Sequence, residues 1–192
     1  MNGFAERDAI FEEDKGRCST WRKHIFNLSA SVETPQFENA TARALGSGWR
    51  LSGIYRANSG TPLTVFTGTD RALSGIQATT QRADQVLADP YGDKTINNWL
   101  NPLAFAQPAL GTYGNSVRNA YDGPARHVVD LSLVRLFRFA NSHRLEARLE
   151  AFNAFNWFLL DNPNTTLSSA TFGRITSSGD PRIMQFAVKY EF

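Results

Sequence analysis

The stretch RIMQFAVKYEF at residues 182–192 decides the fold class. Successive side chains of a β-strand point to opposite faces, so a period of two residues indicates a strand with two different surfaces. One surface is apolar and partly aromatic: Met184, Phe186, Val188, Tyr190 and Phe192. The other is mixed and partly charged: Ile183, Gln185, Ala187, Lys189 and Glu191. The run has about the length of a tilted membrane-spanning strand, and it predicts one.

Four other segments show the same alternation: residues 26–33, 49–56, 129–139 and 143–155. In the last of these, Leu145 and Leu149 share one face while Glu146, Arg148 and Glu150 share the other. The sequence therefore predicts an all-β fold, an antiparallel transmembrane β-barrel segment of about five strands. The charged side chains of the polar face are expected to line the lumen or to pair with neighbouring strands: Arg50, Arg56, Glu146, Arg148, Glu150 and Lys189.

The connections between these strands alternate in length. Residues 35–48 and 140–142 are the shorter ones, and residues 60–124 and 159–181 are the longer ones. Outer-membrane barrels have short periplasmic turns and long extracellular loops, so the long connections are expected outside and Phe192 at the periplasmic face. The segment 152–158 resembles an aromatic girdle, and Arg135 is expected to extend its long stem from the apolar face near the membrane boundary.

The long connection 60–124 carries its own expectations. A short helix is predicted around residues 95–100. Four aromatic side chains of this loop either contact a ligand or pack the loop on itself: Tyr91, Trp99, Phe105 and Tyr113.

Composition excludes several classes of protein. The sequence contains no run of about 18 apolar residues, so no transmembrane helix is predicted. A mean hydropathy of −0.34 is compatible with a barrel, because apolar and polar side chains alternate along its strands. A formal net charge of +2 indicates no nucleic-acid partner. The single cysteine, Cys18, forms no internal disulfide, and His24, His127 and His143 lack metal-ligand spacing. We expect no catalytic residues, no metal and no cofactor, and outer-membrane lipid as a partner.

Five strands predict an incomplete barrel. Bacterial single-chain barrels have at least about eight strands, and each unpaired backbone group in lipid costs several kcal/mol. We therefore expect the remaining strands to come from upstream sequence or from other copies of the chain. Residues 1–18 have no secretory-signal pattern. Residues 1–22 are expected to be the remnant of an extracellular loop, with the barrel segment at 23–192.

Several motifs resemble those of TonB-dependent receptors, most closely the Oar-like group, whose members often carry a carboxypeptidase-regulatory-like domain. The segment WRLSGIYRANSGTPLTV at residues 49–65 is similar to a recurrent GWxLSGIxxxxSGTPxTV pattern, and residues 162–192 carry the most specific match. Further matching segments lie between them: 81–84, 99–105, 111–115, 123–124, 130–133 and 150–156.

The resemblance implies a barrel of about 22 strands with a plug domain in its lumen. It also implies energy from an inner-membrane coupling complex that acts through the plug. Four residues of the last strand would form a signal for the barrel-assembly machinery: Phe186, Val188, Tyr190 and Phe192. The chain contains no plug, no energy-coupling box and no signal peptide, so we expect it to be part of a longer protein.

Three functions remain open on sequence. The leading one is part of a transporter that takes up a scarce solute, such as a metal chelate or a glycan fragment. The second is an outer-membrane structural or adhesion protein without transport. The third is a soluble, secreted β-sandwich that binds carbohydrate.

Overall fold

The computed structural model describes residues 15–75, 81–139 and 143–192, and the chain divides into two compact units. The wall unit comprises His24–Asn58, Arg126–Leu159 and Gly179–Phe192. The loop unit comprises the residues up to Lys23, Ser59–Ala125 and Leu160–Ser178. Each unit is described by itself.

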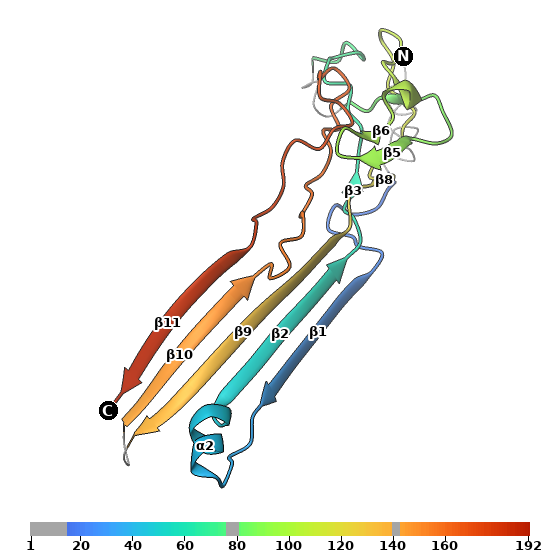
Figure 1. Ribbon diagram of the computed structural model, residues 1–192. Helices are drawn as coiled ribbons and strands as arrows, with labels where there is room; N and C mark the ends of the chain where they lie inside the picture. Colours follow the sequence, from blue (N-terminus) through green and yellow to red (C-terminus); the bar gives the residue numbers. More distant parts are fainter. Residues whose placement is uncertain (1–14, 76–80, 140–142) are drawn as a thin grey trace. The chain divides into compact units, whose positions relative to one another are not determined.

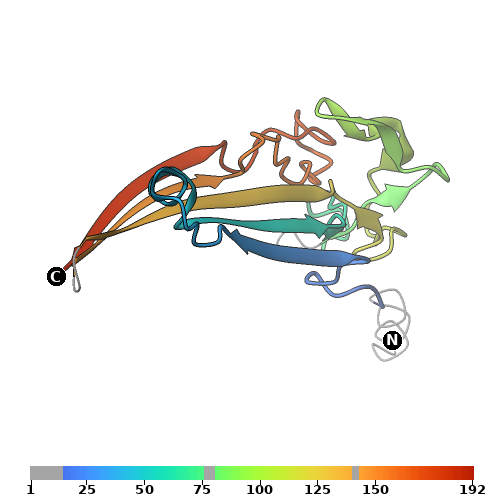
Figure 2. The same cartoon turned by 60° about the horizontal axis from the view of Figure 1, so that its bottom comes forward.

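The wall unit is a five-stranded antiparallel sheet in the order β1-β2-β9-β10-β11 (Figure 1). Its strands confirm the predicted ones: β1 (Ile25–Glu33), β2 (Trp49–Asn58), β9 (Arg126–Phe139), β10 (His143–Phe152) and β11 (Ile183–Glu191). The strands curve along their length, which Figure 2 shows most clearly for β9, β10 and β11. The predicted turn at 140–142 lies outside the described residues.

The strand register places like residues side by side across the whole sheet. Leu133 of β9 pairs with Leu51 of β2 and with Leu149 of β10, and the same row continues to Val32 and Phe186. The adjacent row, on the opposite face, is polar throughout and contains Ser31, Ser52, Ser132, Glu150 and Gln185. The sheet thus has one apolar and one polar face, and it is open at β1 and β11.

The connection between β1 and β2 contains a helix that the sequence reasoning did not predict, α2 (Ala40–Gly46). The side chain of Asn39 caps its first turn by accepting hydrogen bonds from the backbone N–H groups of Thr41 and Ala42. Gly48 follows with a φ of 79°, and a Cβ there would lie 2.6 Å from the Leu136 carbonyl oxygen. Within the described residues no helix is long and apolar enough to cross a membrane.

Arg135 closes the other end of α2. It is only 7% exposed, and its guanidinium donates hydrogen bonds to the carbonyl oxygens of Ala44, Leu45 and Ser47. These carbonyls have no partner inside the helix, so a cation that binds them stabilises its C-terminus. Arg135 therefore interrupts the apolar face in order to cap α2, and does not extend from it as expected.

The loop unit has its own hydrophobic core. Short strand pairs frame it: β3 (Pro62–Leu63) with β8 (Tyr121–Asp122), and β4 (Asp84–Gln85) with β7 (Phe105–Ala106), beside a 3-10 helix (Pro102–Ala104). The core residues come from both long connections: Leu63, Val65, Ala83, Leu100, Ala104, Phe105, Tyr121 and Phe172. The two long connections thus fold together as one structure.

The prediction of a short helix around residues 95–100 is wrong. The segment forms the hairpin of β5 (Tyr91–Thr95) and β6 (Asn98–Leu100), and Lys94 has a φ of 56°. The N–H groups of Trp99 and Leu100 donate to the Gly173 carbonyl oxygen, far along the chain, and not to a preceding turn. Tertiary hydrogen bonds override the local pattern here.

Candidate functional site

The polar face carries all six charged residues that were predicted to line a lumen. Arg50 and Arg56 lie on β2, Lys189 lies on β11, and β10 contributes Glu146, Arg148 and Glu150. The register aligns Glu146 with Lys189 and Arg50 with Val134, so these positions share one surface. The structure brings the predicted residues together on this face.

Most of these charges are partnered within the sheet. Arg148 lies between Glu146 and Glu150, with N–O distances of 2.7 and 3.6 Å. Arg50 lies 3.6 Å from Glu33 of β1, and Lys189 lies 2.6 Å from Glu191. Arg50 and Arg56 thus pair with neighbouring strands, Arg56 with Asp130 of β9. Arg148 and Lys189 pair along their own strands.

A hollow of about 460 Å³ lies on the polar face, at the strand ends from which the long connections leave. Its walls come from four strands and include Arg56, Arg126, Asp130 and Phe152. The carboxylate of Asp130 in this hollow is hydrogen-bonded through both oxygens, and its side chain is 17% exposed. One carboxylate oxygen binds Arg56 Nη2 at 2.5 Å, and the other accepts the Asn153 N–H at 2.9 Å.

Asn153 completes this network just after β10 ends. The residue is buried, has a φ of 48°, and donates from Nδ2 to the carbonyl oxygens of Trp157 and Asp180. Its Oδ1 accepts the N–H of Trp157 at 3.0 Å. Asp130 and Asn153 together hold the turn that leads from β10 toward the loop unit, and they shape one wall of the hollow.

Replacement of Asp130 by alanine should loosen this turn. In this variant the Asn153 N–H loses its acceptor and Arg56 loses its ion-pair partner. A buried donor left without an acceptor destabilises the fold by on the order of 1–3 kcal/mol. We expect faster hydrogen exchange at the Asn153 amide in Asp130→Ala. Asp180→Ala removes the same charge from the same hollow and should leave that exchange rate unchanged, and equal rates in the two variants would contradict the role of Asp130.

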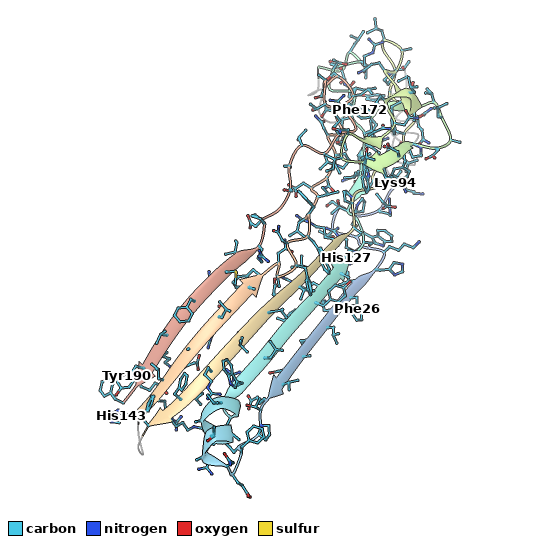
Figure 3. The ribbon with its side chains drawn as sticks, viewed as in Figure 1. Phe26, Lys94, His127, His143, Phe172 and Tyr190 are labelled. Carbon is cyan, nitrogen blue, oxygen red and sulfur yellow. The ribbon has the colours of Figure 1, made fainter. Side chains whose placement is uncertain are left out.

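The apolar face carries aromatic residues at both ends of the strands. At one end Tyr55 binds His127 Nδ1 through its hydroxyl at 2.9 Å and packs near Phe26. At the other end Tyr190 binds His143 Nδ1 at 2.7 Å. Figure 3 shows Tyr190 beside His143 at one end of the sheet, and Phe26 and His127 at the other.

The spacing of these aromatic groups is somewhat less than the height of the apolar band of an outer-membrane barrel. Tyr55 is level with Val129 of β9, and Tyr190 is level, through Leu145, with Phe137 of the same strand. At about 3.3 Å per residue the strand between these levels is roughly 26 Å long, or about 20 Å high at a tilt near 40°. Outer-membrane barrels have an apolar band about 25 Å tall between aromatic girdles.

Three of the four residues expected to form an assembly signal lie within β11. Phe186, Val188 and Tyr190 are exposed on the apolar face of this edge strand, and Phe192 follows its end. Tyr190 and Phe192 stack with ring centroids 6.1 Å apart. All four side chains are exposed.

The four loop aromatics differ in their surroundings. Phe105 is 5% exposed and packs edge to face against Tyr121 and Phe172 at 5.2 and 5.7 Å, so it belongs to the core. Trp99 donates from Nε1 to the Asp122 carbonyl oxygen. Tyr91 accepts the Asp122 N–H, and partial burial raises the pKa of its hydroxyl. Tyr113 is 48% exposed and is the member of the four most open to a ligand.

The polar groups of the loop unit are mostly engaged in its own structure. Burial raises the pKa of Tyr121 to about 12, and its hydroxyl donates to Gln85 Oε1. Asp70 accepts hydrogen bonds from Gln81 and from the N–H groups of Ser74 and Gly75, which lower the pKa of its carboxyl group. Arg17 binds Asp122 at 2.6 Å and thereby ties the segment before β1 to this unit.

Sequence reasoning missed Asp130, Asn153 and the capping role of Arg135. Asp130 lies on the polar face of a predicted strand, but nothing local indicates its contact with Asn153. Arg135 had a visible signal, because a charged residue on an otherwise apolar face needs a partner. Within the part of the chain that the structure describes, no three histidine, cysteine or acidic residues form a metal site.

Comparison with known proteins agrees with this geometry. The family model described as an outer membrane β-barrel domain matches residues 2–185. No curated protein and no solved structure is significantly similar to the chain.

Proposed function

From the fact that this chain belongs to the outer membrane β-barrel family and lies in the bacterial outer membrane, we propose that it forms part of a TonB-dependent receptor for a scarce solute. The wall unit would be five strands of a larger barrel, with the apolar face toward lipid and the polar face toward the lumen. The loop unit would lie at the extracellular end.

The observation that carries this proposal is the loop unit. Both long connections leave the sheet at the same strand ends, between Asn58 and Arg126 and between Phe152 and Ile183. They fold around a common core, with Phe66 N–H bonded to the Thr165 carbonyl oxygen and Leu167 N–H to that of Phe66. A large loop with its own core can bind a solute or cover the entrance of a barrel, which simple turns cannot do.

The polar face supports a lumen. Many of its charges are partnered, and Arg56, Arg126 and Asp130 line the hollow at the loop end. Ligand sites often lie in the mouths of β-barrels. The open edges at β1 and β11 support a larger barrel, because unpaired strand edges are not stable in lipid. We propose that the rest of the barrel and a plug complete the receptor and that an inner-membrane complex energises it through the plug.

The barrel-assembly machinery is the partner that we propose for the last strand. Phe186, Val188, Tyr190 and Phe192 would be its recognition residues, since they are exposed along an edge strand and at its end. An edge of this kind is open to pairing with a strand of another protein.

Uptake in the source bacterium tests the transport proposal. A strain lacking the gene should lose accumulation of at least one labelled iron chelate, cobalt chelate or oligosaccharide, and a protonophore should abolish the same uptake in the parent strain. The restored wild-type gene should recover it. Unchanged uptake across the panel, with reduced attachment of cells to surfaces, would favour the adhesion function instead.

A further inference from the structure

The hollow at the loop end of the polar face lies within one unit, and hydrogen bonds tie its walls together. All of its lining residues belong to the wall unit, and its volume of about 460 Å³ is in the range of small-molecule sites, about 300–1,000 Å³. The Leu159 carbonyl oxygen accepts hydrogen bonds from the Gly179 N–H at 2.7 Å and from Arg126 Nη2 at 3.3 Å. Asn153 Nδ2 donates to the Asp180 carbonyl oxygen at 3.3 Å. Walls that are ordered in advance lose little conformational entropy when a ligand binds.

The formal charges that line the hollow cancel. They belong to two arginines and two aspartates: Arg56, Arg126, Asp130 and Asp180. Arg56 and Asp130 form an ion pair with each other at 2.5 Å. An anionic solute meets two carboxylates here, and a cationic solute meets two guanidinium groups, so like charges oppose either one. The balance of charge favours an uncharged solute.

Three polar side chains of the hollow have hydrogen-bonding capacity to spare. The carboxylate of Asp180, the side-chain amide of Asn58 and the Nε and Nη1 groups of Arg56 form no hydrogen bond with any residue that the structure describes. A carboxylate accepts hydrogen bonds, a guanidinium group donates them, and an amide does both. A hydroxyl group also donates and accepts, so a solute with several hydroxyl groups can bind all three side chains.

Phe152 adds an apolar surface to the same hollow. Its side chain is 41% exposed and is level with Ile183 of β11, which also lines the hollow and is 43% exposed. One face of a sugar ring consists largely of C–H groups and can pack flat against an aromatic ring. The hydroxyl groups of the sugar project from the rim of its ring, toward polar partners. A sugar therefore matches both the polar and the apolar groups of this hollow.

We propose that the hollow binds an uncharged sugar unit of an oligosaccharide. The ring of Phe152 packs against the C–H face of the sugar, Asp180 and Asn58 hydrogen-bond its hydroxyl groups, and Arg56 donates to one of its oxygens. The inference names the class of solute for the receptor proposed above, and it rests on the assignment of the polar face to the lumen in that proposal.

Binding of oligosaccharides by the full-length protein tests the site. The protein is purified from outer membranes in mild detergent, labelled with a fluorophore and applied to an array of uncharged, acidic and amino oligosaccharides. We expect binding to uncharged members of the array. The affinity for the strongest of them, measured in solution, should change little between low and high salt, because no ion pair forms with the ligand.

Two variants test the residues of the hollow, each with a matched control. Asp180→Asn and Phe152→Ala should each weaken binding of that oligosaccharide about tenfold, since one loses a hydrogen bond to a charged group and the other an aromatic contact. Glu38→Gln makes the same exchange of carboxylate for amide at an exposed position between β1 and β2. Phe158→Ala removes a ring that is 83% exposed and lies outside the hollow. Both controls should bind like the wild type.

Three results would overturn the proposal: no binding to any uncharged oligosaccharide, binding to acidic or amino members alone, or equal binding by the wild type, Asp180→Asn and Phe152→Ala. Assembly of each variant is checked by the heat-dependent shift of folded barrels on gels. If either variant does not assemble, Asn58→Ala takes its place, with an expected loss of about threefold for one neutral hydrogen bond. Unchanged binding by Asn58→Ala would then contradict the proposal.

The binding and uptake experiments separate this site from the transport proposal. Uptake of a metal chelate that depends on the gene, without any binding of uncharged oligosaccharides, would contradict the sugar site and leave transport standing. Oligosaccharide binding that depends on Asp180 and Phe152, with unchanged uptake in the strain lacking the gene, would leave the sugar site standing and contradict transport.

Discussion

Replacement of Leu133 by arginine should destabilise the assembled barrel by about 2–4 kcal/mol, the cost of a lipid-facing arginine near the middle of the bilayer. Leu133 lies at the centre of the apolar row, between Leu51 of β2 and Leu149 of β10. An arginine there must leave water with no acidic partner in the row. Urea unfolding of the barrel in lipid vesicles, followed by tryptophan fluorescence, measures the change.

Ser132→Arg is the matched control for Leu133→Arg. Ser132 is the preceding residue on the same strand, so it points to the opposite face, and it pairs there with Glu150 of β10. An arginine at this position meets water and a carboxylate, and we expect a change below about 1 kcal/mol. If both variants lost the same stability, the assignment of the two faces to lipid and lumen would be wrong.

Truncation of Phe105 to alanine should unfold or strongly loosen the loop unit. Its ring contacts Tyr121 and Phe172, which come from different segments of the chain, so its loss leaves a cavity where these segments meet. Large-to-small changes of buried aromatic residues cost about 3–5 kcal/mol. Hydrogen exchange should rise at the Ala83 and Leu167 amides, which bond to the Val65 and Phe66 carbonyl oxygens.

The control for Phe105→Ala is Tyr113→Ala, because Tyr113 lies in the same loop but is half exposed. This variant should keep the exchange rates of the wild type, and any loss of solute binding by it would then report direct contact with a ligand. Exchange at wall amides such as Leu136 should not change in either variant. Protection of the Ala83 amide in Phe105→Ala would show that the core does not depend on this ring.

The strands and their faces were predictable because the alternation is local and persistent. In the segment 143–152 the polarity of most residues indicates the face of the sheet on which they lie. The neighbouring strands show the same pattern independently. The charges that share the polar face follow from the same period, so most of that surface could be assigned without a structure. Their individual partners could not, since Arg148 pairs along its strand and Arg50 across strands.

The features that were missed depend on contacts distant in sequence. The segment 95–100 forms a hairpin because its N–H groups bind Gly173, and no local signal announces that partner. The contact of Asp130 with Asn153 likewise needs the pairing of β9 and β10 to exist first. The helix α2 was easier to predict from the sequence, because Asn39 before the alanine-rich segment 40–44 is a helix-start signal.

The loop unit is built from three segments that are separate in the sequence. Thr61 and Asn162, which hydrogen-bond through their side chains, are 101 residues apart in sequence. Closing so long a segment carries an entropic cost, so such contacts tend to form late in folding. The strands β9 and β10 lie between these stretches, and their pairing shortens the segment that has to close. We therefore expect the loop unit to reach its native structure late in folding. Antibodies against a surface formed by all three of its stretches should then recognise only chains whose wall strands have already paired correctly.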